Sequence, residues 1–261
     1  AGYLNPRQLC VSLADAAKKK LHLITHTEIL KLRKKEGYWQ LIGEKNCLIA
    51  EGEKVILANG FDAQRLLDFN GLSLSRSRGQ VDVVATQEKI SGLKLPVCHD
   101  GYLLPEVAGS HLIGASYNFD EFSLELSVSD QVENINRSNR ILYEKLGVED
   151  TPLRGRASIR TTSMDHLPLV GPVPNEAAYL ADYKNICHGQ RHERYPAASY
   201  RSGLFITTGH GSRGLVSCFA AAAYLTSLIA GKPITLAKDV AHRLHPARFL
   251  IRSLKKRPGR R

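Results

Sequence analysis

The sequence predicts a mixed α/β protein in which a long antiparallel segment interrupts a helix-covered sheet. Residues 54–60, KVILANG, end on Asn-Gly, and their apolar character is typical of a buried strand in a sheet covered on both faces. Residues 203–231 run from a strand through a glycine-rich turn into a helix of small residues. Between Gly71 and about Asp165, glycine-bounded runs such as GQVDVVA and HLIGASY predict the antiparallel insertion.

Helix signals flank these strands. Asn5 is a favoured N-cap, and Pro6 suits the first position of a helix that the Lys18–Lys20 cluster would close. Apolar residues at helical spacing predict a second helix over about residues 129–146 and a third in EAAYLADYKNICHG. Helices and strands therefore alternate along the chain.

Composition limits the class of protein. With 261 residues and 43% hydrophobic content, the chain can bury a core. No apolar run approaches the ~20 residues that cross a bilayer, and the most apolar stretch, residues 218–231, is too short. The five scattered cysteines form no CxxC, which argues against a disulfide framework and a zinc site. We therefore expect a cytoplasmic protein with no membrane partner and no metal.

The positive charge is concentrated at the C-terminus. The net charge is +11, and residues 242–261 hold eight Lys or Arg and no acid. This segment is either a solvated tail or a contact for the phosphates of a nucleic acid. Apolar residues at 249–251 and 254 predict a short packed helix within it. The candidate nucleic-acid-binding residues are Arg252, Lys255, Lys256, Arg257, Arg260 and Arg261.

The turn between the strand and helix of residues 203–231 is a candidate ligand site. A glycine-rich loop that enters a helix presents backbone N–H groups and the positive end of the helix dipole. This arrangement suits a phosphate or the pyrimidine end of a flavin. A tight packing turn without a ligand would use the same residues, so both interpretations stay open.

Arg160 is the second candidate, because it ends a strand that is predicted to enter the core. A buried guanidinium without a partner is costly. Arg160 therefore either pairs with an acid, for which Asp165 is available, or binds a ligand carboxylate. Tyr102 lies in a short strand of the insertion, where a core role is common. Beside Arg160 it could donate its hydroxyl to the same carboxylate.

A motif series links these stretches to a known family. In order it reads GYLNP, HTEILKL, VILANGFDA, RGQV, DGYLLP, LIGASY, IRTTSMDHLPLVG and TTGHGSRGL. The series resembles the FAD-dependent D-amino-acid-oxidase-like enzymes, including glycine oxidase. The likeness is strongest to the FAD domain of bifunctional tRNA-modifying enzymes, which share GASYNFDE and the basic tail LHPARFLIRSLKK.

The resemblance implies an FAD-binding domain that is interrupted by an antiparallel substrate domain. Residues 1–70 and 166–236 would belong to the FAD-binding domain, 71–165 to the substrate domain, and 237–261 to a basic tail. The first Rossmann βαβ unit, whose GxGxxG fingerprint is missing from these residues, would lie upstream. A methyltransferase domain, which uses SAM, would precede it in the full-length protein.

The resemblance also implies a site. Arg160 and Tyr102 would hold the substrate carboxylate as catalytic residues. Ile29 would touch the adenine side of FAD through its backbone, and the glycine-rich turn would surround the isoalloxazine. The implied cofactor-binding residues are Ile29, Ala58, Asn59, Gly60, Gly209, His210, Gly211, Ser212, Arg213 and Gly214. His210 and His166 are expected to be neutral packing or turn histidines rather than catalytic bases.

The implied reaction acts on the wobble uridine of a tRNA. It removes the carboxymethyl group from 5-carboxymethylaminomethyl-2-thiouridine and gives 5-aminomethyl-2-thiouridine and glyoxylate. Two alternatives stay open. The chain could be an oxidase or dehydrogenase of glycine or other small free amino acids, or an inactive fragment that only contributes tRNA binding.

Overall fold

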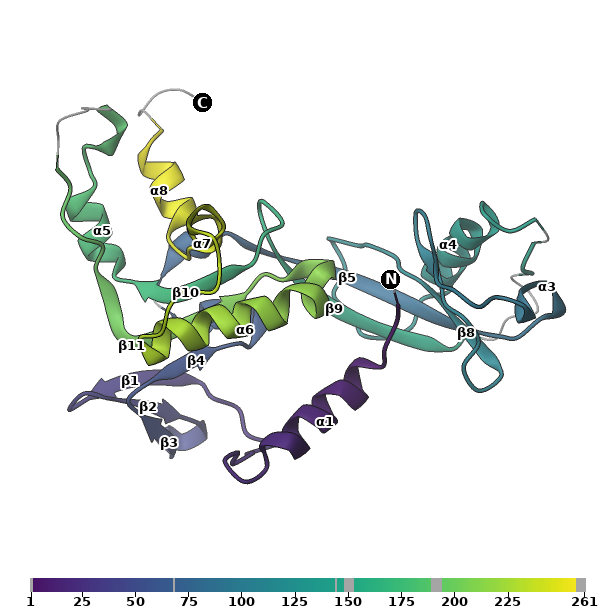
Figure 1. Ribbon diagram of the computed structural model, residues 1–261, viewed down its shortest axis with the longest axis horizontal. Helices are drawn as coiled ribbons and strands as arrows, with labels where there is room; N and C mark the ends of the chain where they lie inside the picture. Colours follow the sequence, from purple (N-terminus) through teal and green to yellow (C-terminus); the bar gives the residue numbers. More distant parts are fainter. Residues whose placement is uncertain (1, 68, 144, 148–152, 189–193, 257–261) are drawn as a thin grey trace. The chain divides into compact units, whose positions relative to one another are not determined.

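The computed structural model divides the chain into two compact units, and it describes residues 2–67, 69–143, 145–147, 153–188 and 194–256. The first unit comprises Ala1–His22 and Arg76–Arg160, and the second comprises Leu23–Ser75 and Thr161–Arg261. Both units contain strands and helices (Figure 1), so the predicted mixed α/β class is confirmed. The division into FAD-binding, substrate and tail segments stays a prediction.

The second unit is built on a sheet with the strand order β10-β11-β4. β10 (Leu169–Pro174) pairs antiparallel with β11 (Tyr200–Thr208), whereas β4 (Val55–Leu57) pairs parallel with it. α6 (Gly214–Ala230) packs on this sheet through its buried Tyr224 and Leu225, which meet Val170 of β10. The sequence prediction of strand, turn and small-residue helix is therefore confirmed.

β4 differs from its prediction. It was expected to be buried on both faces, but it is an edge strand with a single described neighbour, and Ile56 is 47% exposed. Apolar sequence alone does not distinguish an edge strand from a central one, because burial is decided by the segments that cover it.

A second, antiparallel sheet lies in the same unit. Its strands β1 (Lys31–Lys35), β2 (Tyr38–Ile42) and β3 (Leu48–Gly52) follow one another in chain order. Trp39 of β2 is buried, and its indole N–H donates to the carbonyl of Ser202 at 2.9 Å. This bond connects the small sheet to β11. Shorter helices complete the unit: α2 (Ala63–Leu66), α5 (Glu176–Asp182), α7 (Lys238–Leu244) and α8 (Arg248–Leu254).

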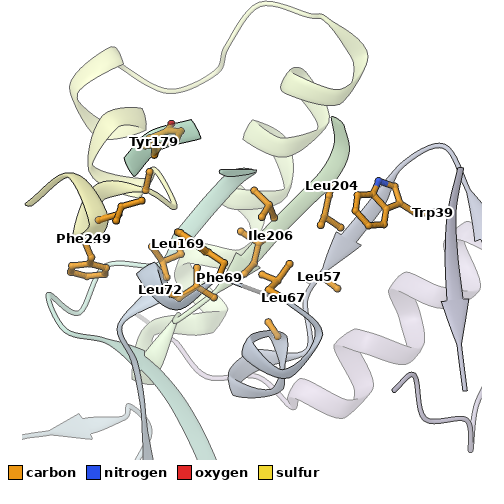
Figure 2. Close-up of a cluster of buried hydrophobic side chains, with 14 of the residues drawn as sticks. Trp39, Leu57, Leu67, Phe69, Leu72, Leu169, Tyr179, Leu204, Ile206 and Phe249 are labelled. Carbon is orange, nitrogen blue, oxygen red and sulfur yellow. The ribbon is translucent and has the colours of Figure 1, made fainter. Parts of the chain in front are cut away.

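The main hydrophobic core of the second unit gathers side chains from distant parts of the sequence (Figure 2). Leu169 and Ile206 come from the β10–β11 pair, Phe69 from the segment before β5 (Leu74–Ala85), and Phe249 from α8. The predicted C-terminal helix is thus confirmed, and its apolar residues pack as expected.

A buried ion pair attaches α8 to the loop between β9 (Gly155–Ser163) and β10. Arg248, on α8, donates to both carboxylate oxygens of Asp165, at 2.7 and 3.0 Å, and to the carbonyl of Pro168 at 3.1 Å. Arg252 also donates to Asp165, at 2.7 Å. Partial burial by itself would raise the pKa of Asp165, but the hydrogen bonds and charge of Arg248, with Arg252, hold it well below its ordinary range.

The first unit contains a five-stranded sheet with the order β6-β7-β8-β5-β9. β5 pairs antiparallel with β8, as do β6 with β7 and β7 with β8, which agrees with the antiparallel insertion that the sequence predicts. The strand bounds are β5 (Leu74–Ala85), β6 (Val97–Cys98), β7 (Tyr102–Leu103), β8 (Ser110–Gly114) and β9 (Gly155–Ser163).

Among the described residues of this unit, the helices are α1 (Pro6–Ala17), α3 (Glu88–Ser91) and α4 (Val128–Asn139). α1 starts as predicted, since the backbone N–H of Gln8 donates to the Asn5 side chain at 3.2 Å. α4 ends at Asn139, earlier than the predicted residue 146. The Asn139 amide exchanges hydrogen bonds of 2.9 and 2.7 Å with the backbone of Leu146, which turns the chain back instead of extending the helix.

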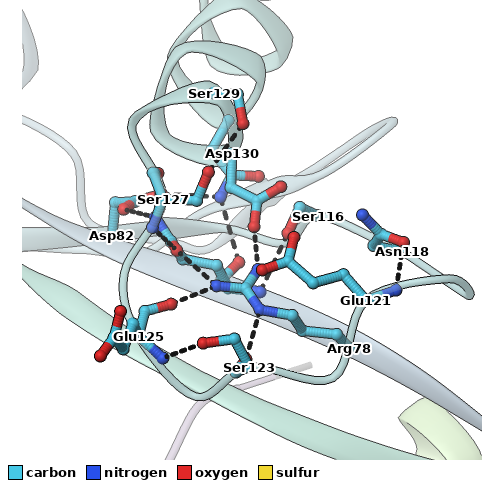
Figure 3. A network of polar contacts seen from close by, with 12 residues as sticks. Arg78, Asp82, Ser116, Asn118, Glu121, Ser123, Glu125, Ser127, Ser129 and Asp130 are labelled. Carbon is cyan, nitrogen blue, oxygen red and sulfur yellow. Dashed lines mark hydrogen bonds and ion pairs between the residues drawn. The ribbon is translucent and has the colours of Figure 1, made fainter.

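Arg78 of β5 organises a buried polar network in the first unit (Figure 3). Its side chain is fully buried. It donates to the carbonyl of Ser123 at 2.6 Å and to the Gln80 side chain at 3.3 Å, and it also contacts the Glu125 carbonyl and the Asp130 carboxylate. The network fixes the loop before α4 against β5, because Arg78 donates to Ser123 and Glu125 in that loop and also contacts Asp130 in the first turn of α4.

Within the described residues, one helix is long and apolar enough to cross a membrane, by length and composition alone. It comprises Gly211–Ala230, and 22% of its most apolar 18-residue stretch is buried inside the structure. The expectation that no segment is long enough was therefore wrong, because the glycine-rich turn extends the apolar helix. The helix packs on β10 within the second unit.

We predict that Asp165→Asn lowers the free energy of unfolding by about 3 kcal/mol at pH 7, because it leaves the Arg248 guanidinium buried without its counter-charge. The folded-state pKa of Asp165 is depressed, so its contribution is present above the ordinary pKa of about 3.9 and is lost as the pH falls below that value. Urea unfolding at pH 7 and near pH 3 measures both effects. The exposed Asp120→Asn is the control; equal losses for both variants, or a loss independent of pH, would contradict the prediction.

Candidate functional site

The strand pairing of the second unit brings two predicted cofactor segments together. β4 and β11 are parallel, with Leu57 opposite Ile206, so their carboxyl ends lie at the same edge of the sheet. Residues 58–60 follow β4, and the turn of residues 209–214 follows β11. The Thr208 hydroxyl donates to the carbonyl of Gly60 at 2.8 Å. The carboxyl edge of parallel strands is where α/β folds bind ligands.

The turn needs glycine at two positions. Gly209 and Gly211 have φ values of 72° and 55°, in the left-handed region. A Cβ would lie 3.2 Å from Leu74 at Gly209 and 3.3 Å from the Thr162 hydroxyl at Gly211. The turn is therefore packed tightly against β5 and β9 as they enter this unit, and its outer side faces away from these neighbours.

The helix that follows the turn begins without a side-chain cap. Neither the short 3₁₀ segment Gly211–Arg213 nor α6 has a capping hydrogen bond from a side chain, and Ser212 and Arg213 are exposed. The first N–H groups of a helix lack intrahelical partners and carry partial positive charge. The end of this turn can thus accept an anionic or polar ligand group.

His210 is held as a neutral residue of the turn. Its Nε2 lies 2.9 Å from the Thr207 hydroxyl, and its Nδ1 lies 2.7 Å from the Ser217 hydroxyl. Because Ser217 donates its own proton to the Arg213 carbonyl, His210 donates from Nδ1 and accepts at Nε2. Burial lowers the pKa of His210, which keeps it uncharged. This arrangement agrees with the expected packing histidine.

Two cavities open beside the end of β4. One, of about 370 Å³, is lined by Ile29, Ala58 and Asn59 among others. The other, of about 400 Å³, is lined by Ala58, His210 and small or apolar side chains of α6. The structure therefore brings predicted residues from three separate segments of the sequence to neighbouring cavities, because β4 contributes to both.

In the first unit, Arg160 of β9 lies over β5 at Gly79. A Cβ at Gly79 would stand 1.8 Å from the Arg160 Nη1 atom, so no side chain other than hydrogen fits under the guanidinium. Arg160 Nη1 donates to the Ser116 carbonyl at 3.2 Å, and the guanidinium lies over the Tyr117 ring at 4.4 Å. These contacts orient the group and leave most of its N–H donors unused.

Arg160 is half-buried and forms no ion pair with any described acidic residue. The proposed pairing with Asp165 was wrong, because Asp165 is taken by Arg248 and Arg252. Tyr102 of β7 lies within the electrostatic field of Arg160. Burial raises the pKa of Tyr102 and outweighs the opposing effect of Arg160, so the phenol keeps its proton. The pair offers a cation and a hydroxyl donor to a carboxylate.

The predicted nucleic-acid-binding residues divide into three groups. Arg252 donates to Asp165, and part of its charge is neutralised. Lys255 and Lys256 are exposed at the end of α8. Arg257, Arg260 and Arg261 lie outside the described residues.

A family profile described as "FAD dependent oxidoreductase" (DAO) matches residues 1–228. The chain belongs to this family. Membership makes it an FAD-dependent oxidoreductase.

Two curated relatives are longer proteins, of which this chain matches only a part. Both are named "tRNA 5-methylaminomethyl-2-thiouridine biosynthesis bifunctional protein MnmC". The protein from Pseudomonas savastanoi pv. phaseolicola is 32% identical over 97% of this chain, and that from Pseudomonas entomophila is 33% identical over 97%. The chain spans 39% of the length of each relative.

Solved structures share the fold at low identity. Glycine oxidase from Geobacillus kaustophilus has a TM-score of 0.70 and 21% identity, and the alignment covers 92% of this chain and 57% of that one. Iminodiacetate oxidase from Chelativorans sp. BNC1 has a TM-score of 0.69 and 19% identity, covering 92% and 58%. The chain therefore has the α/β fold of these oxidases.

The residues of the second unit fit a flavin. The uncapped helix start can face a polar, electron-rich ring edge, and the neighbouring cavities have mainly apolar walls that suit a planar aromatic group. The described residues contain no acidic side chain in the turn of residues 209–214 that would repel the negative charge of a reduced flavin.

Sequence reasoning missed the residues that position Arg160. Gly79, Ser116 and Tyr117 form its support, although only Arg160 and Tyr102 were proposed as site residues. One signal was available: a glycine inside a strand pattern marks the close approach of another group. The partner of Gly79 could not be named, because β9 lies far along the sequence.

We predict that Gly79→Ala displaces the Arg160 guanidinium and weakens the binding of a small carboxylate at least about tenfold. The free energy of unfolding should change by less than about 1 kcal/mol, since a flexible side chain can move away from the new methyl group. Calorimetric titration with glycolate and thermal unfolding measure the two quantities. Gly92→Ala, where no atom lies within 4 Å of the new Cβ, is the matched control. Unchanged glycolate affinity would contradict the prediction.

Proposed function

We propose that the chain oxidises a CH–NH bond next to a carboxylate and that Arg160 selects this carboxylate. One observation carries the proposal: a half-buried arginine, oriented by Ser116 and Tyr117, has no acidic partner among the described residues. A partly buried positive charge without a counter-ion lowers stability, and a bound carboxylate ligand would supply that counter-ion. Family membership provides the redox class.

The proposed substrate is 5-carboxymethylaminomethyl-2-thiouridine at the wobble position of a tRNA. Support comes from the relatives named as tRNA 5-methylaminomethyl-2-thiouridine biosynthesis proteins and from the basic C-terminal segment. The side group of this nucleoside is a glycine joined through its nitrogen. The relatives are much longer than this chain and are named bifunctional, so we propose that a SAM-dependent methyltransferase forms the other half of the protein. A tRNA substrate fits a cytoplasmic location.

In the proposed reaction, bound FAD supplies the hydride acceptor. Arg160 would hold the carboxylate in a fixed orientation, and Tyr102 would donate its hydroxyl to the same group. Loss of the hydride and the N–H proton leaves an imine, and water then releases glyoxylate and 5-aminomethyl-2-thiouridine. The amine must be neutral to react, and the positive Arg160 disfavours its protonation.

We propose that the second unit, described above, binds the cofactor and the first unit binds the carboxylate. The cofactor residues would be Ile29, residues 58–60 and residues 209–214. The N–H groups of the turn would stabilise negative charge on the ring. His210 would act through its fixed hydrogen bonds to Thr207 and Ser217 rather than as a base.

A second function shares the same recognition element. Glycine and other small amino acids carry the carboxylate and amine that Arg160 and Tyr102 would bind, so an oxidase of free amino acids is the rival. The inactive fragment that only binds tRNA is the remaining alternative. The three candidate functions differ in which compound, if any, reduces a bound flavin.

The experiment is an anaerobic visible spectrum of the protein with FAD, taken before and after adding undermodified tRNA, with glycine in parallel. Bleaching by tRNA and not by glycine supports the proposal. Bleaching by glycine alone supports the amino-acid oxidase. A bound flavin that neither reduces, or no bound flavin, would contradict both oxidase functions for this chain.

We predict that Arg160→Lys lowers kcat/KM by about 100-fold, because an ammonium cannot reproduce two parallel hydrogen bonds to a carboxylate. Arg156→Lys, an exposed position on the same strand, should leave kcat/KM within about twofold. Steady-state kinetics of the FAD-loaded full-length protein on undermodified tRNA measure both. A loss of the same size in the two variants would show that the effect is general to β9 rather than specific to carboxylate binding.

A further inference from the structure

A cleft in the second unit combines tyrosines with basic side chains. It has a volume of about 570 Å³ and is lined by residues of α5, the start of β11, α7 and α8. These four elements are labelled in Figure 1. Its walls include Tyr179, Tyr200, His245, Arg243, Arg252 and Lys255. The size is that of a site for one small organic ligand or one nucleotide.

The aromatic wall of the cleft is pre-organised. The Tyr179 ring packs edge-on against Tyr183 and Tyr200, with centroids 5.1 and 6.4 Å apart. Tyr179 and Tyr183 are buried, whereas Tyr200 is 37% exposed. Tyr200 is therefore the ring that a ligand can reach, while Tyr179 packs against it and Tyr183 packs against Tyr179.

His245 fixes the orientation of Tyr200. The backbone N–H of Ala247 donates to His245 Nδ1 at 3.1 Å, so the ring proton is on Nε2, which lies 3.0 Å from the Tyr200 hydroxyl. Burial, with the charges of His242 and Arg248, lowers the pKa of His245 to about 4. His245 is thus neutral at pH 7 and serves as a hydrogen-bond donor to the tyrosine.

The basic side of the cleft carries positive charges that the described acidic residues do not neutralise. Arg243 and Lys255 are exposed and have no ion pair with any described residue. Arg252 and Arg248 share a single carboxylate, that of Asp165. Among the described residues, no acidic side chain lines the cleft. The cleft is therefore complementary to an anion.

We propose that this cleft binds a single-stranded segment of RNA, with one base against Tyr200 and the flanking phosphates at Arg243 and Lys255. A positively charged groove with an accessible aromatic ring is the arrangement that single-stranded nucleic acids favour, because phosphates and base faces are both satisfied. A polyanion without bases would pair with Arg243 and Lys255 and make no stacking contact with the Tyr200 ring. The choice of RNA rests on the proposed function, in which the substrate is a tRNA.

The test uses the FAD-loaded full-length protein and a fluorescent, unmodified tRNA anticodon stem-loop. The dissociation constant is measured by anisotropy at several KCl concentrations. Arg243→Ala/Lys255→Ala should reduce the slope of log K against log [KCl] by about two. Tyr200→Leu should weaken binding about tenfold, and Tyr200→Phe, which keeps the ring, should bind within about twofold of wild type. Lys45→Gln/Lys232→Gln removes two exposed charges outside the cleft and is the matched control.

Inorganic polyphosphate is the second probe, because it has phosphates and no bases. It should respond to Arg243→Ala/Lys255→Ala and not to Tyr200→Leu. Equal weakening of RNA and polyphosphate by Tyr200→Leu would overturn the role of the ring. RNA affinity that is unchanged in the cleft variants, or reduced as much by the control pair, would overturn the proposal as a whole. Thermal unfolding of each variant separates loss of binding from loss of fold.

Flavin reduction by undermodified tRNA is recorded with the same samples, so the two proposals fail independently. If the cleft variants lose RNA affinity while wild type never reduces its flavin, the cleft proposal stands and the proposed function fails. If wild type oxidises the tRNA and the variants bind it equally well, the cleft proposal fails and the function stands.

Discussion

The parallel pairing of β4 with β11 is the constraint on which the second unit's candidate site depends. Parallel strands cannot be joined by a tight turn, so their alignment brings together segments from opposite ends of the sequence. Residues 58–60 and the turn of residues 209–214 meet because Leu57 lies opposite Ile206. The Thr208–Gly60 hydrogen bond then fixes the two segments against each other. The cavities beside β4 follow from this alignment.

Each unit also contains a buried arginine that holds irregular backbone in place. Arg78 binds carbonyls of the loop before α4, and Arg248 binds the loop before β10 while it anchors α8. Hydrophobic contacts are non-directional and cannot specify where a loop lies, whereas a guanidinium with five donors has a fixed geometry. Arg160 differs from both, because its described contacts leave donors unused. This difference is the basis for our proposal that Arg160 binds a ligand, whereas Arg78 and Arg248 are structural.

The tyrosine–arginine cleft also depends on such an anchor. α8 is placed by the Arg248–Asp165 pair and by the burial of Phe249 and Leu250. Its position brings Lys255 to the same opening as Arg243 of α7 and Tyr200 of β11. A basic segment that the sequence describes as a tail is therefore, up to Lys256, a packed part of the unit with a defined concave surface.

The sequence by itself determined the local elements and the family. Asn5 and Pro6 start α1 because the cap is made by neighbours in the chain, and the glycines at 209 and 211 predict a turn because no other residue adopts its backbone readily. Motif order identified an FAD-dependent oxidoreductase. Only the tertiary structure decided which partner each charge takes, that β4 pairs with β11 alone among the described residues, that α4 stops at Asn139, and that Gly79 makes room for Arg160. These outcomes depend on groups far apart in the sequence, and the energy of an ion pair or a close contact is set by distance in space, which a linear pattern does not contain.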